Sequence, residues 1–293
     1  MTIVERAIER LRRQGGHPTA PATVAVGTMV HESAPDLAQA SSARRILIDR
    51  DALRQAGYLP ETAVDRRFAS YFRQIKRPLI TKVQSAADAA GPNPRVIVMT
   101  SALPGDGKTF TSINLALSLA HERDVSVVLV DADIPKPHVS RIFGVDAEPG
   151  LTDALASVDL DIESLVLPTD VGNLSVLPAG RGADNATELL ASARMGAVLT
   201  RLLSRHPRRI VLLDSPPLMV SSEARSLVAI AGQLVMVVRS GRTPRKAVLD
   251  ALADIGAERP VSLVLNQGPT GFGGGYGAYG DYGAYGESGA EKA

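Results

Sequence analysis

The chain has 293 residues, with 32 Lys and Arg against 31 Asp and Glu, five histidines and no cysteine. The length holds one α/β domain of roughly 200 residues together with extensions. The lack of cysteine excludes disulfides and thiolate metal sites and fits a reducing compartment. The longest apolar stretch, at 227–238, is well short of the ~20 residues that a membrane helix needs.

The N-terminal segments differ from the rest in charge and composition. Residues 1–95 carry a net charge of +6 and the remainder −5; a basic segment can meet an acidic partner or anionic lipid, and solvated helix faces explain the same pattern. The segment at 1–14 predicts an amphipathic helix, not a secretion signal. Residues 15–43, rich in Pro, Ala, Ser and Thr, predict a flexible linker. We expect a short strand at 45–48, followed by helices near 51–55 and from about 61 to 89.

Beyond residue 95, apolar runs typical of buried strands alternate with segments of helical periodicity. This alternation is typical of βαβ units, in which helices cover both faces of a parallel sheet. The prediction is an α/β domain over 44–268 with a doubly wound, mainly parallel sheet. The strands are expected near 96–100, 126–131, 174–177, 209–213, 234–239 and 261–265, and the helices near 108–122, 185–204, 221–230 and 244–255.

A glycine-rich loop, Ala102-Leu-Pro-Gly-Asp-Gly-Lys-Thr109, follows the strand expected at 96–100. Backbone N–H groups in such a loop can surround phosphate oxygens, its lysine can bridge the terminal phosphates, and its threonine hydroxyl can bind Mg²⁺. The loop therefore predicts a P-loop NTPase-like fold that binds ATP and Mg²⁺; an ordinary glycine turn before a helix is the alternative. The predicted nucleotide-binding residues are Leu103, Pro104, Gly105, Asp106, Gly107, Lys108, Thr109 and Phe110.

Two later apolar runs end in carboxylates, at Asp131-Ala-Asp133 and at Asp214-Ser-Pro-Pro217. The carboxyl ends of parallel strands form the edge at which ligands bind, and Mg²⁺ takes one or two carboxylates together with phosphate oxygens. Thr109, Asp131 and Asp214 are the predicted metal ligands. A helix cap or a turn is the alternative role for any one of these aspartates.

Asn266 follows the last predicted strand. Since an asparagine at this place often contacts adenine in related P-loop proteins, Asn266 is a predicted base-binding residue, with a turn-forming role as the alternative. The five histidines lack metal-ligand spacing and are expected to have no special role. Basic residues are not interleaved with aromatic ones, so no nucleic-acid partner is expected.

The last segment, 269–293, spaces tyrosines three residues apart among glycines. Because this composition cannot bury a core, we expect the tail to be disordered when free. Mobile hydroxyls beside a nucleotide site are predicted phosphoryl acceptors; a Gly/Tyr sequence for weak association is the alternative. The predicted acceptors are Tyr276, Tyr279, Tyr282 and Tyr285.

The P-loop, the Asp-x-Asp motif, the hydrophobic-Asp-Ser-Pro-Pro motif and the tyrosine-rich tail resemble, in this order, the bacterial tyrosine kinases (BY-kinases). The chain is most similar to the soluble autokinases of exosortase and exopolysaccharide loci (XrtA-type). The resemblance implies an ATP-dependent kinase that phosphorylates its own tail and regulates exopolysaccharide polymerisation or export. The implied catalytic residues are Lys108, Asp131, Asp133 and Asp214, with Asp131 assisting removal of the tyrosine proton.

The resemblance also implies partners: a membrane polysaccharide co-polymerase (Wzz-type) as activator, a protein-tyrosine phosphatase, and further copies of the chain in a homo-oligomer. The expected location is the cytoplasm, at the inner face of the membrane through the first partner. Two motifs depart from the family. Lys136 replaces an arginine after Asp-x-Asp and lacks its bidentate geometry. The oligomerisation motif Glu-x-x-Arg-x-x-Arg/Lys appears as Ser70-Tyr-Phe-Arg73-Gln-Ile-Lys76, without its glutamate, so the resemblance does not extend to a ring-shaped oligomer.

Two other functions remain open from the sequence. ATPases that position partition and division machinery carry an additional lysine near the start of the loop, where this chain has Leu103. That lysine reaches the phosphates of a dimer partner, so its absence disfavours a non-kinase ATPase switch. A nucleotide-binding regulator without turnover is the third function, if the arginine missing after Asp133 is essential.

Overall fold

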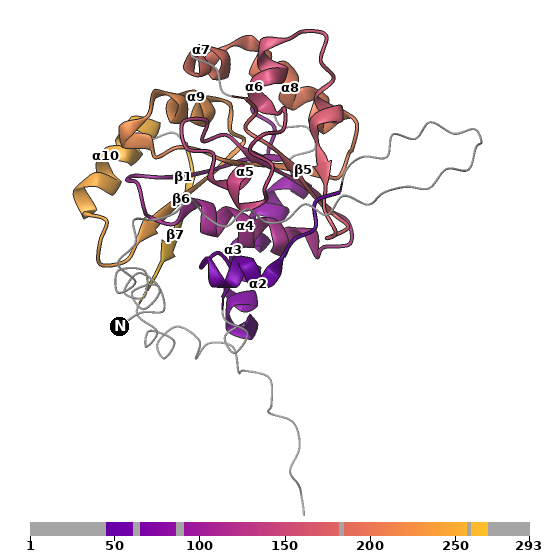
Figure 1. The fold of residues 1–293 in the computed structure, drawn as a ribbon. Coiled ribbons are helices and arrows are strands. Elements are labelled where there is room, and N and C mark those ends of the chain that lie inside the picture. Colours follow the sequence, from indigo (N-terminus) through magenta and orange to yellow (C-terminus); the bar gives the residue numbers. More distant parts are fainter. Residues whose placement is uncertain (1–44, 61–64, 86–90, 182–184, 257–258, 269–293) are drawn as a thin grey trace, which may run out of the picture.

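The computed structural model describes residues 45–60, 65–85, 91–181, 185–256 and 259–268. The helix predicted at 1–14, the linker at 15–43 and the tyrosine-rich tail at 269–293 lie outside these residues. Within the described residues, strands and helices alternate along the chain. The strands form one central sheet, and the helices pack around it (Figure 1).

The sheet has seven strands in the order β3-β4-β2-β5-β1-β6-β7. Six of them are parallel, whereas β3 runs antiparallel to β4 at one edge. The predicted doubly wound, mainly parallel sheet is therefore confirmed. The strands are β1 Val96–Ser101, β2 Ser126–Asp131, β3 Leu167–Pro168, β4 Leu174–Leu177, β5 Arg209–Asp214, β6 Gln233–Arg239 and β7 Val261–Asn266.

Helices cover both faces of this sheet (Figure 1). One core, which includes Ile97 and Met99, is shared by α2 Arg50–Gln55, α3 Asp65–Ser85, α4 Lys108–Ala120 and α5 His138–Ile142. The first three of these helices lie below the sheet in the figure. The other core contains Val98 and Leu213. The elements that pack there are α6 Leu151–Ala156, η2 Ile162–Leu165, α7 Ala186–Ala191, α8 Ala193–Ser204, η3 Leu218–Val220, α9 Ser222–Ile230 and α10 Arg245–Ile255.

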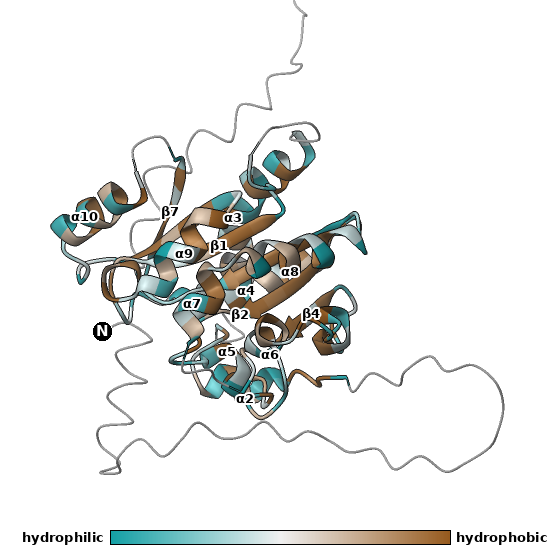
Figure 2. Cartoon of the chain, turned by 90° about the horizontal axis from the view of Figure 1, so that it is seen from above, coloured by the Kyte–Doolittle hydropathy of each residue, from teal (hydrophilic) through white to brown (hydrophobic). Residues whose placement is uncertain are grey.

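The central strands are apolar without interruption because both of their faces are covered. Successive residues of β1, such as Ile97 and Val98, enter opposite cores, as the alternation of side chains along a strand requires. Figure 2 shows these strands in brown, between helices that also carry hydrophilic residues. In the described part of the chain, helices that are long and apolar enough to cross a bilayer do not occur.

The structure corrects three sequence predictions. The helix predicted at 185–204 is two helices, α7 and α8, because Ser192 between them is extended, with φ −76° and ψ 157°. The strand predicted at 45–48 is a single bridge between Ile46 and Thr169. The sequence does not predict β3, α5 or α6, because elements of two to six residues are too short to display a period.

Lys76 fixes α3 to the C-terminal end of α4. This residue is buried, and its Nζ donates to the carbonyl oxygen of Ser118 at 2.7 Å and forms an ion pair with Glu122 at 2.7 Å. A cation at this place also faces the negative end of the α4 dipole. The lysine of the oligomerisation motif is therefore engaged within its own chain.

Candidate active site

Three aspartates lie at the carboxyl edge of the sheet. Asp131 ends β2 and Asp214 ends β5, and the two are register partners in the parallel ladder. Asp133 follows two residues after β2 and is also buried. The structure thus brings together the three carboxylates that the sequence singles out, at the edge where open parallel sheets bind ligands.

The glycine-rich loop joins β1 to α4 at the same edge. Gly105 and Gly107 have φ angles of +83° and +95°, in the left-handed region that favours glycine. In the part of the chain that the structure describes, no side chain caps the N-terminus of α4 at Gly107. Free N–H groups and the positive end of a 13-residue helix form a place for an anion such as phosphate.

Lys108 is the first residue of α4, and its buried Nζ lies 4.0 Å from Asp133 Oδ2. An ammonium has three donors, so this long contact leaves donors for a second anion. Burial raises the pKa of the Asp133 carboxyl; the charge of Lys108 lowers it and that of Asp214 raises it further.

Asp214 accepts hydrogen bonds from two hydroxyls of α4. Thr109 Oγ1 donates to its Oδ2 at 2.7 Å, and Ser112 Oγ donates to its Oδ1 at 2.8 Å. The hydroxyls lie on one helix face because their residues are three apart. Burial raises the pKa of Asp214, against the charge of Lys108 and these two hydrogen bonds, which lower it. Two of the predicted metal ligands, Thr109 and Asp214, are therefore in direct contact.

Asp131 has one satisfied and one unsatisfied oxygen. Its Oδ2 accepts from the backbone N–H and from Oγ of Ser140, both at 2.7 Å, whereas its buried Oδ1 has no hydrogen-bond partner among the described residues. Burial raises the pKa of this carboxyl to about 8; the Ser140 hydrogen bonds lower it, and the charges of Asp214 and Asp133 raise it. An orphaned buried oxygen of this kind takes a proton or a cation.

These residues fit a divalent cation that arrives with phosphates. Three buried carboxylates and one buried lysine lie at this edge, so with all four ionised they carry two negative charges in excess. Among the described residues, no three His, Cys, Asp or Glu side chains are grouped so that they could hold a metal ion. Mg²⁺ needs no such group, since it takes one or two carboxylates and completes its shell with phosphate oxygens and water.

The remaining loop residues have mainly structural contacts. The N–H of Leu103 donates to Asp106 Oδ2 at 3.2 Å, Pro104 is exposed, and the Phe110 ring packs edge-on against Phe68 of α3 at 5.8 Å. Any contact that these residues make with a nucleotide stays a prediction.

Asn266 lies against the phosphate loop. Its Nδ2 donates to the carbonyl oxygen of Asp106 at 2.9 Å, and its Oδ1 accepts from the N–H of Gln267 at 2.9 Å. Both halves of the amide are thus engaged within the chain, and the predicted contact with adenine stays a prediction. Lys136 is exposed just after Asp133, and the four acceptor tyrosines lie outside the described residues.

The predictions from the sequence do not include three side chains that shape the site. Ser112 is detectable in principle, because it lies one helical turn after Thr109. The hydroxyl of Ser140 donates a hydrogen bond to Asp131, and Thr243 Oγ1 donates one to Asp106 Oδ1 at 2.6 Å. Neither has a local signal, because each lies on a different element from the residue that it holds.

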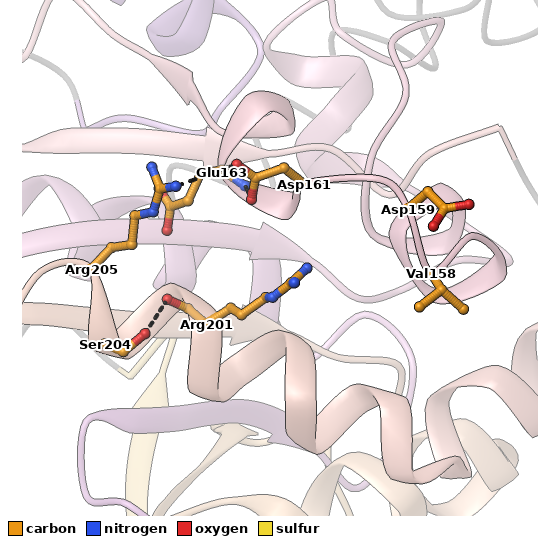
Figure 3. A pocket seen from close by; sticks show the side chains of 7 residues that line it. All are labelled: Val158, Asp159, Asp161, Glu163, Arg201, Ser204 and Arg205. Carbon is orange, nitrogen blue, oxygen red and sulfur yellow. Dashed lines mark hydrogen bonds and ion pairs between the residues drawn. The ribbon is translucent and has the colours of Figure 1, made fainter.

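Two pockets lie away from the phosphate loop. A pocket of about 410 Å³ is lined by Arg201, Arg205, Asp161 and Glu163 (Figure 3). Glu163 pairs with Arg209, the first residue of β5, so this pocket lies near the amino-terminal edge of the sheet. Arg205 forms an ion pair with Asp161 at 3.6 Å within this pocket, and the phosphate loop contributes none of its lining.

Comparison with known proteins identifies the family. A family model described as an AAA domain matches residues 94–245, more than half of the chain. The chain belongs to this AAA domain family. The matched part of the AAA-domain protein includes the phosphate loop and all three aspartates of the site.

Relatives of this AAA-domain protein are named as tyrosine kinases. Tyrosine-protein kinase wzc of Salmonella typhimurium is 34% identical over 160 residues, which are 54% of this chain and 21% of wzc. YwqD of Bacillus subtilis, also a tyrosine-protein kinase, is 32% identical over 155 residues, which are 53% of this chain and 64% of YwqD. The chain spans about a fifth of the length of relatives such as wzc.

Solved structures agree with these relatives. The BceF tyrosine kinase domain is 29% identical, with a TM-score of 0.59 over 74% of this chain and 86% of that domain. The VpsO kinase domain is 26% identical, with a TM-score of 0.57 over 71% of this chain and the whole of that domain. The expected similarity to bacterial tyrosine kinases is confirmed, and the AAA-domain protein has the fold of their kinase domains.

Proposed function

We propose that this AAA-domain protein is an ATP-dependent protein-tyrosine autokinase that phosphorylates the tyrosines of its own C-terminal tail. The observation that carries the proposal is the meeting of Lys108 with three buried carboxylates at the uncapped N-terminus of α4. Phosphoryl transfer depends chiefly on positioning and charge stabilisation, and this arrangement provides both. The similarity to tyrosine-kinase domains supports the choice of acceptor.

The chemistry divides between the loop and the aspartates. The bond from the γ-phosphorus to its bridging oxygen breaks, and a bond from the tyrosine oxygen forms, which leaves ADP and phosphotyrosine. Lys108 and the N–H groups at the start of α4 stabilise the negative charge on the phosphates. Asp214 and Thr109, with Asp131 beside them, would hold Mg²⁺, which would supply further neutralisation of that charge.

Asp131 is the proposed acceptor of the tyrosine proton. A phenol with a pKa near 10 must lose or share its proton during transfer, and Asp131 Oδ1 is a buried carboxylate oxygen of this site that lacks a partner among the described residues. Asp131 is fully buried, so a tyrosine reaches it only when neighbouring side chains move. Asp133, slightly more exposed, is the other candidate.

Phosphotyrosine formation by the purified chain with Mg·ATP tests the proposal. We expect label on the tail of the native chain, none with Lys108→Met, and almost none with Asp131→Asn, which keeps the shape of the side chain. Comparison with Asp133→Asn assigns the proton acceptor: label lost with Asp133→Asn alone would move the role to Asp133. ATP hydrolysis without phosphotyrosine in the native chain would instead favour the ATPase switch.

The same proposal extends to exopolysaccharide production. By resemblance, the kinase works in the cytoplasm at the inner membrane face, where a Wzz-type co-polymerase activates it and a tyrosine phosphatase resets it. Each phosphate adds about −1.5 to −2 charges, so a tail with four phosphates repels other copies. We propose that phosphorylation in this way loosens a homo-oligomer, and assembly mass before and after phosphorylation measures the effect.

A further inference from the structure

The tip of the phosphate loop is held from three directions through Asp106. Its Oδ1 accepts from Thr243 Oγ1 at 2.6 Å, and its Oδ2 accepts from the N–H of Leu103 at 3.2 Å. Its carbonyl oxygen accepts from Asn266 Nδ2 at 2.9 Å. Asp106 is 3% exposed, although its neighbours Pro104 and Gly105 are open to solvent.

Thr243 is itself fixed by a tight turn between β6 and α10. Its Oγ1 accepts from the N–H of Arg239 at 3.0 Å, and its own N–H donates to the carbonyl of Arg239 at 3.0 Å. Gly241 inside the turn has φ +67°. Arg239 and Asn266 are register partners in the β6–β7 ladder, so both outside contacts of Asp106 come from the same end of this strand pair.

Gly107 shows how closely the loop is held. A Cβ atom at this position would lie 2.0 Å from Asn266 Nδ2, far inside van der Waals contact. Gly105, two residues earlier and also at positive φ, has open space around its Cβ position within the described structure. The contact with Asn266 is therefore a specific approach of β7 to the loop.

We propose that Asp106, Thr243 and Asn266 form a brace that presets the phosphate loop, with Thr243 as a positioning residue for nucleotide binding. The inference rests on the proposed function only in taking the loop as the nucleotide site. The Asp106 carboxylate keeps one orientation because a hydrogen-bond donor occupies each of its two oxygens. Thr243 and Leu103 supply those donors, and the preset loop loses less conformational freedom when the ligand binds.

Two variants of Thr243 test the brace. Thr243→Val keeps the shape of the side chain and removes the hydroxyl, whereas Thr243→Ser keeps the hydroxyl. Titration of each folded variant with a fluorescent ATP analogue gives its Kd. We expect Thr243→Val to raise the Kd by about tenfold, the effect of one lost hydrogen bond to a charged group, and Thr243→Ser to restore it to within about twofold.

The outcomes separate a positioning role from a merely structural one. If Thr243→Val only lowers the melting temperature and leaves the Kd of the folded protein unchanged, the brace is wrong, whatever the phosphotyrosine assay gives. Combination with Asp106→Ala adds a second criterion: the double variant should bind no more weakly than Asp106→Ala alone, because the two residues share one interaction. A native chain that binds the nucleotide yet forms no phosphotyrosine would contradict the kinase proposal and leave the brace supported. A native chain that binds no nucleotide would contradict both.

Discussion

At the scale of single residues, the site depends on carboxylates whose charge is unfavourable in the free protein. Burial raises the pKa of Asp131, Asp133 and Asp214, and the nearby lysine lowers it for Asp133 and Asp214 only in part. Bound cation and phosphate together change this environment, because a cation stabilises the ionised carboxylates and the phosphates complete its shell. The residues are thus arranged for a ligand that brings both charges at once.

The two loop glycines make a matched pair for mutation. Gly107→Ala places a methyl group against Asn266 and strains the backbone, whereas Gly105→Ala only strains the backbone. We expect Gly107→Ala to lower the free energy of unfolding by about 1–3 kcal/mol more than Gly105→Ala, and to weaken nucleotide binding more strongly. Urea denaturation and nucleotide titration measure the two effects; equal losses in both variants would argue against the close approach of Asn266.

Single residues also show what the sequence can and cannot predict. Lys108 and the aspartates are predictable, because motif spacing and strand ends place them without tertiary information. The hydrogen-bond partners of residues in the site cannot be predicted in this way. The contact of Asn266 with the loop is not predicted, and its predicted contact with the base stays a prediction. Thr243 has no sequence signal, since its contact with Asp106 depends on how the β6–β7 pair lies against the β1–α4 turn.

At the scale of elements, α3 is part of the nucleotide-binding core through its contact with α4. Phe68 packs on Phe110 near the start of α4, and Lys76 binds the carbonyl of Ser118 near its end. α3 therefore spans the length of the helix that begins at the phosphate loop. The family's oligomerisation motif lies on this same helix, but its lysine is directed inward.

Lys76→Met tests this internal role. The variant loses the hydrogen bond to Ser118 and the ion pair with Glu122, so we expect the free energy of unfolding to fall by about 1–2 kcal/mol. Arg73→Met, at the exposed middle position of the motif, is the control and should leave stability within about 0.5 kcal/mol of the native value. Sedimentation should show the same assembly state for native protein and Lys76→Met; dissociation without loss of stability would place Lys76 in a contact between chains.

Elements differ in how well the sequence predicts them. Long apolar runs give β1, β2, β5 and β6 to within a residue or two, and the regular period of α4 and α10 gives those helices. The break at Ser192 escapes prediction, because serine is tolerated in helices and the change of direction there depends on tertiary packing, in which α7 also contacts α9. β3 also escapes, because its pairing with β4 comes from tertiary contacts and involves two residues.

At the scale of the whole molecule, the domain with the phosphate loop precedes the tail that carries the proposed acceptor tyrosines. β7 ends at Asn266, beside the phosphate loop, and the tail follows directly. The chain has six tyrosines, of which Tyr58 and Tyr71 lie in the described domain and the other four in the tail.

Deletion of 269–293 and replacement of the four tail tyrosines by phenylalanine test this separation. We expect both variants to bind the ATP analogue with native affinity and to form no phosphotyrosine. The phenylalanine variant keeps the tail and so controls for its removal. Label that persists in either variant must be on Tyr58 or Tyr71, and would show that the tail is not the main acceptor.

We propose that the loop, Lys108 and the aspartates surround one magnesium-bound triphosphate. A crystal structure of the chain with Mg²⁺ and a non-hydrolysable ATP analogue tests it most directly. We expect the phosphates at the N-terminus of α4, within hydrogen-bond distance of Lys108 Nζ, and the metal beside Thr109 and Asp214. Phosphates bound elsewhere, or a metal remote from all three aspartates, would contradict it.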